Sequence, residues 1–155
     1  MIPEYKLYHG AVLCELIDIA DVDISIGELK EDGRLSSYSL NQCVGLHIKH
    51  STKRLPPWQF TVTKANLVDL VQLRRRYRSV YIALVCDTDG IVAITVDEAV
   101  HMVAESESEQ AWLRVSRSRG RWYSVTGNGA EHPIKRSRGI GAIIETLASH
   151  KNQAV

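Results

Sequence analysis

A run of alternating residues at 44–50 constrains the fold of this chain more than any other feature. Because successive side chains of a strand point to opposite faces, His47 and Lys49 share one face, while Leu46 and Ile48 share the other. A proline pair follows, and it ends the strand or confines it to a sheet edge because proline lacks the N–H that a ladder needs. The run therefore predicts a strand with one face in the core and one polar face.

Chain length and composition set the size of the fold. The chain has 155 residues and 45% of them are apolar, which is enough for one globular domain with a core. We expect an α+β or α/β domain with a central mixed β-sheet flanked by helices. Its core spans 1–104, and 105–155 adds a β-hairpin and a short helix packed on the same domain.

Cysteine usage and hydropathy bear on the compartment. The chain has no run of about 18 apolar residues that could span a membrane, and its start lacks the basic and then apolar order of a secretory signal. Cys14, Cys43 and Cys86 are odd in number, far apart and each within an apolar run. This pattern favours reduced, buried thiols over disulfides or a zinc site. We expect a cytoplasmic protein with no membrane partner.

Hydrophobic periodicity predicts the remaining elements. Helices are expected over 5–20, 64–78, 97–104 and 140–149, and strands over 22–27, 35–40, 58–62, 80–86, 91–95, 112–116 and 121–126. Thr63 is the expected N-cap of the second helix. Turns are expected at 31–34, 41–42, 87–90 and 119–120, and a polar link at 105–109. The first helix has two alternative apolar stripes for its buried side, Leu7, Ala11, Cys14 and Ile17 or Leu13, Leu16 and Ala20.

The charges of the chain are segregated although its formal net charge is only +1. Acidic residues dominate the part before position 33, whereas arginine-rich runs follow at 74–78 and 114–138. Each run alone also fits a solvated helix end or hairpin. Together with Lys49, Lys53 and Arg54 they favour an anionic partner.

Six side chains are candidates for contacting nucleic-acid phosphates, namely His47, Lys49, Lys53, Arg54, Arg119 and Arg121. Their donors suit phosphate oxygens, and such contacts supply affinity without base selectivity. Trp58, Trp122 and Tyr123 could stack on unpaired bases, with core packing as the alternative and the favoured one for Trp58. DNA or RNA is the expected partner.

The element order over 5–95 resembles that of the PD-(D/E)XK nuclease-like superfamily. The resemblance rests on Gly10 and Glu15 in the first helix, and on the strand that ends at Lys49, which resembles the catalytic strand of that superfamily. The segments 46–54 and 86–91 are also similar to a group of small uncharacterised bacterial proteins, a similarity that implies no function.

Departures from the superfamily pattern bear on catalysis. The resemblance implies Mg²⁺ held by an Asp on the second strand and by an acid two residues before the lysine. Ser37, Ser39 and His47 stand at those places. The resemblance thus implies a degenerate nuclease fold that binds nucleic acid and needs no cofactor.

Two other functions remain open at this stage. One is a Mg²⁺-dependent nuclease with a displaced site, built from Glu15, Lys49 and either Asp23 or Glu28. The other is a protein-interaction or homodimer module without a nucleic-acid role, in which the arginine-rich hairpin docks an acidic partner or the acidic N-terminal part of a second copy.

Overall fold

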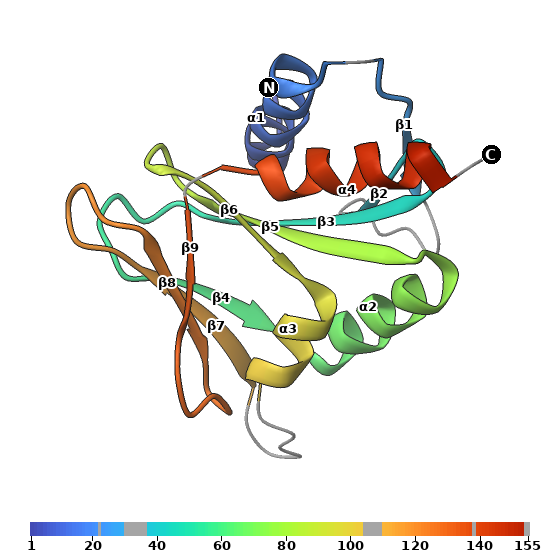
Figure 1. Cartoon of the computed structure of the whole chain (residues 1–155). Coiled ribbons are helices and arrows are strands. Elements are labelled where there is room, and N and C mark those ends of the chain that lie inside the picture. Colours follow the sequence, from blue (N-terminus) through green and yellow to red (C-terminus); the bar gives the residue numbers. More distant parts are fainter. Residues whose placement is uncertain (22, 30–36, 104–109, 138, 154–155) are drawn as a thin grey trace.

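Two stacked β-sheets organise the fold (Figure 1). The computed structural model describes residues 1–21, 23–29, 37–103, 110–137 and 139–153. The turn expected at 31–34 and the link expected at 105–109 lie outside these ranges. The elements are α1 (Glu4–Ile19), β1 (Ile26–Leu29), β2 (Ser37–Leu40), β3 (Val44–Ser51), β4 (Trp58–Val62), α2 (Lys64–Arg76), β5 (Ser79–Cys86), β6 (Gly90–Thr95), α3 (Val96–Met102), β7 (Ala111–Ser116), β8 (Tyr123–Gly127), β9 (Ile134–Arg136) and α4 (Gly141–Gln153).

The first sheet has the strand order β1-β2-β3-β5-β6. Among its described strands, β3 and β5 form the one parallel pair, and β4 and α2 form the crossover between them. A parallel pair needs such a long connection, whereas β5 and β6 are joined by the short turn expected at 87–90. The predicted mixed α+β architecture is confirmed.

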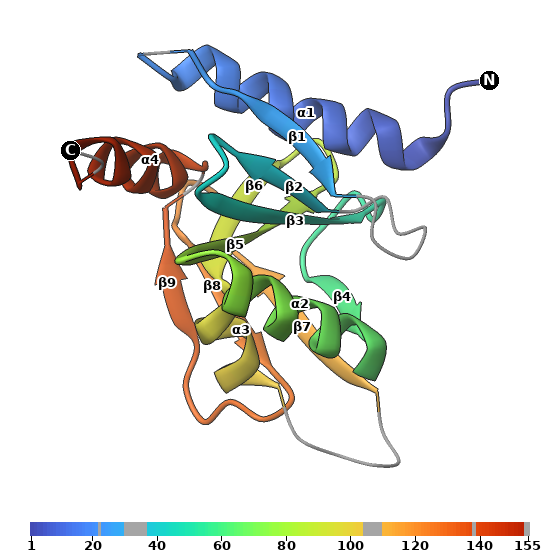
Figure 2. The same cartoon turned by 90° about the vertical axis from the view of Figure 1, so that its right-hand side faces the viewer.

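Helices cover one face of the first sheet, as Figure 2 shows for α1 and α4 above it. Val12 and Leu16 of α1 and Ile143 of α4 pack there against the apolar face of β3. The other face of the sheet is covered by α2, α3 and the second sheet, so β3 is covered on both sides.

The second sheet is antiparallel, with the order β4-β7-β8-β9. Its inner side chains, such as Trp58, Phe60 and Tyr123, pack against the first sheet. The hairpin predicted near 112–126 is present as β7 and β8. This hairpin pairs with β4, so the predicted core at 1–104 and the predicted extension at 105–155 both contribute strands to this sheet. Strand β9 was not predicted from the periodicity.

Two threonines start helices. Thr63 accepts a hydrogen bond from the backbone N–H of Asn66, and the Asn66 side chain bonds back to the backbone of Thr63. Thr95 forms the same capping box with Glu98 at the start of α3. The predicted N-cap at Thr63 is confirmed, and the helix after it ends at Arg76 rather than at 78.

Helix α1 does not bury either predicted stripe intact. His9, Val12 and Leu16 are its buried residues, whereas Leu7 and Ile17 are 58% and 60% exposed. Cys14 is exposed as well, so the prediction of a buried thiol is wrong there, although all three cysteines are free. No described helix has both the length and the apolar content required to cross a membrane.

Candidate nucleic-acid interface

The polar face of β3 is buried rather than presented to solvent. His47 is only 8% exposed and is paired with Ile82, which packs in the core between the two sheets. Ser37 Oγ lies 3.0 Å from its Nδ1. Burial, followed by the charge of Lys49, lowers the pKa of His47 to about 3. His47 is thus a neutral core side chain, and its burial does not fit the predicted phosphate contact.

Lys49 lies on the same face of β3 and is half-buried. Its Nζ donates a hydrogen bond to Oδ1 of Asn66, 3.1 Å away, at the start of α2. Burial lowers the pKa of Lys49. The lysine therefore joins β3 to α2, and its charge is only partly available to an outside ligand.

The carboxylates of the displaced nuclease site do not meet Lys49. Glu15 lies on α1, which covers the Leu46 face of β3. Glu28 is paired with Tyr38, which is paired with Leu46, so it belongs to that same face, and Asp23 is an exposed residue that precedes β1. The described residues contain no group of three or more His, Cys, Asp or Glu side chains able to hold a metal ion.

The β3–β4 loop, the β5–β6 turn and the β7–β8 loop converge at one end of the two sheets. The β3–β4 loop carries Lys53 and Arg54, and the β7–β8 loop carries Arg119 and Arg121. Pairing of β4 with β7 brings the first loop beside the second, and the Asp87 N–H donates to the carbonyl oxygen of Ser51 at 3.0 Å. The structure thus gathers four of the six predicted side chains at one end, and all four are exposed.

A polar clamp holds the β7–β8 hairpin to the first sheet at this end. Arg117 donates to both carboxylate oxygens of Asp89, with Nε 2.7 Å from Oδ2. The buried Tyr123 hydroxyl donates to the same Oδ2 at 2.6 Å. Burial, followed by the hydrogen bond to Asp89, raises the pKa of Tyr123, and the bond to Asp89 raises that of Arg117. The clamp fixes the hairpin tip that carries Arg119 and Arg121.

The outer side of the second sheet is basic, aromatic and hydroxylated. Strand alternation turns eight side chains outward, namely Gln59, Thr61, Trp112, Arg114, Ser116, Ser124, Thr126 and Lys135. None of the eight is a carboxylate. Arg121 and Trp122 of the hairpin tip adjoin this surface, and with them Ser116, Ser124 and Lys135 line an open depression of about 1010 Å³. We call these ten residues the basic face.

Arg114 is held in place by neutral groups. Its guanidinium lies 4.4 Å from the centre of the Trp112 ring, and its NH2 and Nε donate to Oε1 of Gln59 at 2.8 and 3.3 Å. These partners orient the arginine without cancelling its charge. The basic face therefore holds a positioned cation beside an aromatic ring.

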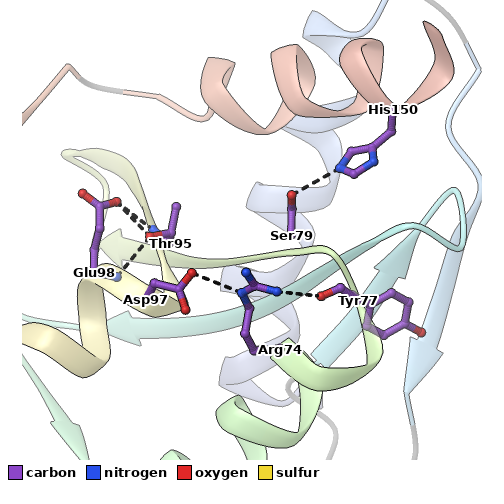
Figure 3. A network of polar contacts seen from close by, with 7 residues as sticks. All are labelled: Arg74, Tyr77, Ser79, Thr95, Asp97, Glu98 and His150. Carbon is purple, nitrogen blue, oxygen red and sulfur yellow. Dashed lines mark hydrogen bonds and ion pairs between the residues drawn. The ribbon is translucent and has the colours of Figure 1, made fainter. Parts of the chain in front are cut away.

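A separate polar network lies across the start of β5 (Figure 3). Oγ of Ser79 is 3.2 Å from Nε2 of His150, and Arg74 is paired with Asp97 at 3.1 Å. The Tyr81 hydroxyl is also 2.7 Å from Oγ1 of Thr146. These contacts attach α4 to β5 and α2 to α3, so they are contacts between elements of the fold.

Trp112, Arg114 and Lys135 were not selected from the sequence as site residues. The available signal was the alternation of the 112–116 and 121–126 strands, which places a tryptophan and an arginine on the same side as serines. The alternation alone does not indicate a site, because it does not say which side of the strands is covered by the rest of the fold.

Comparison of the chain with protein-family models, curated proteins and solved structures returned no match.

Proposed function

We propose that this protein binds nucleic acid through the basic face. The observation that carries the proposal is an outward sheet surface that combines Arg114, Lys135 and Trp112 with hydroxyl and amide groups, and none of its eight described strand residues is a carboxylate. Arg121 and Trp122 extend the surface at the hairpin tip. Cations and hydroxyls of this kind contact backbone phosphates, which gives affinity with little dependence on sequence.

The neighbouring loops enlarge the proposed surface. Arg119 lies on the same tip, and Lys53 and Arg54 lie on the β3–β4 loop at that end. Two acids of the β5–β6 turn at that end are engaged, since Asp87 accepts from Tyr8 at 2.7 Å and Asp89 is held by the clamp. We propose no catalytic step and no cofactor for this face.

We also propose a cytoplasmic location, where the free thiols of the chain would stay reduced.

The test is fluorescence anisotropy with labelled DNA and RNA across a salt series. The double variant Arg121→Ala with Lys135→Ala should bind about tenfold more weakly, and its slope of log affinity against log salt should be smaller by about 1.4, because each lost contact to a single strand removes roughly 0.7. Mg²⁺ is included, and the oligonucleotide should be recovered intact.

The matched control is Lys6→Ala with Arg75→Ala, two exposed cations on α1 and α2. It removes the same charge away from the basic face and should leave binding unchanged. Equal weakening by both pairs would mean that only net charge matters, and absence of binding by the native chain at low salt would overturn the proposal. Cleavage that requires Mg²⁺ would restore the nuclease alternative.

Self-association is a second candidate function, and the outer side of α1 favours it. Leu7, Cys14 and Ile17 are exposed on one side of this helix, where apolar side chains gain from burial against a partner. Sedimentation of the chain should then show a dimer that persists in high salt, and Ile17→Glu should dissociate it. Val68→Glu, at a similarly exposed position on α2, is the control.

A further inference from the structure

The exposure of Trp122 is not explained by folding. This indole is 64% exposed and lines the depression of the basic face together with Arg121 and Lys135. Trp58, by contrast, is fully buried in the core between the sheets. A tryptophan left in water at a basic surface provides an open aromatic face for a ligand.

Trp112 supplies a second aromatic surface with a fixed orientation. It points outward from β7, and the guanidinium of Arg114 lies over its ring at 4.4 Å. Gln59 holds that guanidinium in turn. The indole and the planar guanidinium are both groups on which nucleobases stack.

The two indoles stand toward opposite ends of the basic face. Trp112 is near the start of β7, whereas Trp122 precedes β8 beside Ser116, the last residue of β7. Ser116 follows Trp112 by four positions in the strand, which corresponds to about 13 Å at roughly 3.3 Å per residue. A chain that reached from one indole to the other would pass Arg114, Ser116 and Lys135, which offer donors to its phosphates.

We propose that the basic face binds single-stranded nucleic acid, with unpaired bases stacked on Trp112 and Trp122 and the intervening phosphates held by Arg114 and Lys135. This inference rests on the proposed nucleic-acid function and specifies its ligand. Base faces are hidden in a duplex, so stacking on both indoles requires an unpaired strand. Stacking accepts any base, so sequence preference should be weak.

The experiment compares three probes of the same length in nucleotides per strand: a single-stranded thymidine oligonucleotide, the same strand in a duplex, which adds a second phosphate backbone, and an abasic strand. The unpaired, base-containing strand should bind at least about tenfold more tightly than either of the others. It should also quench the intrinsic tryptophan fluorescence. Trp122→Ala should weaken its binding about tenfold, and Trp122→Phe should restore most of the loss because an aromatic ring remains.

The salt slope separates stacking from charge. Trp122→Ala should leave the slope unchanged, whereas Arg121→Ala should reduce it. Equal affinity for all three probes, with no effect of Trp122→Ala or Trp112→Ala, would overturn this inference and leave the proposed function standing. Absence of binding to every probe would overturn both. Circular dichroism of each variant verifies that the fold is retained.

Discussion

Replacement of Asp89 by alanine is expected to lower the free energy of unfolding by more than about 2 kcal/mol. Asp89 joins the β5–β6 turn to the β7–β8 hairpin, because it accepts hydrogen bonds from Arg117 and from Tyr123. A hydrogen bond to a charged group contributes about 1.5–3 kcal/mol, and the variant would leave the buried Tyr123 hydroxyl without this acceptor. Urea denaturation followed by circular dichroism measures the loss.

The control for Asp89 is Asp97→Ala, which removes the same side chain from another ion pair. Arg74 and Asp97 are 42% and 68% exposed, against 18% and 21% for Arg117 and Asp89. An exposed pair contributes less than about 1 kcal/mol. A loss for Asp89→Ala no larger than that for Asp97→Ala would show that the clamp does not stabilise the fold. Tyr123→Phe, which removes only the hydroxyl, should cause an intermediate loss.

The stability of the protein is expected to fall in mild acid because of His47. Burial and the nearby Lys49 depress the pKa of this histidine from 6.5 to about 3 in the folded chain. Between these two values the unfolded chain binds a proton that the folded chain does not bind, so stability decreases as the pH falls through this range. The loss should amount to about 2 kcal/mol between about pH 7 and about pH 5.

Two measurements check this pH dependence. Urea denaturation at several pH values should give a slope that His47→Gln reduces, whereas His132→Gln, at an exposed position, should leave it unchanged. Burial also lowers the pKa of His9, so part of the slope should survive in His47→Gln. A ring proton of His47 that titrates near pH 6.5 by NMR in the folded protein would contradict the prediction.

Local features of the fold could be predicted because their causes are local. Thr63 caps α2 through a hydrogen bond to a residue three positions later, and a short turn that ends at Gly90 joins two adjacent strands. The alternation in β3 and β4 also predicted which residues share a face. Helix α1 was harder, because two apolar stripes competed and the side that is buried includes His9.

The candidate site could be predicted only in part. The β3–β4 and β7–β8 loops are exposed, and the four cations predicted there lie at one end of the sheets, as pairing of β4 with β7 requires. His47 and Lys49 were expected on an open face, but α2 and the second sheet cover that face. The resemblance to PD-(D/E)XK nucleases stays a prediction.

The sequence by itself determined which side chains of each strand lie together, since a strand alternates with a period of two whatever surrounds it. It also determined where α2 begins, because Thr63 caps that helix through a residue only three positions later. Only the tertiary structure decided which face of each sheet meets solvent. Burial depends on the segments that pack from far along the chain. Here β4 and β7 pair although they are far apart in the sequence, and their inner residues cover Ile82 and Leu84 of the first sheet while Trp112 and Arg114 stay outside.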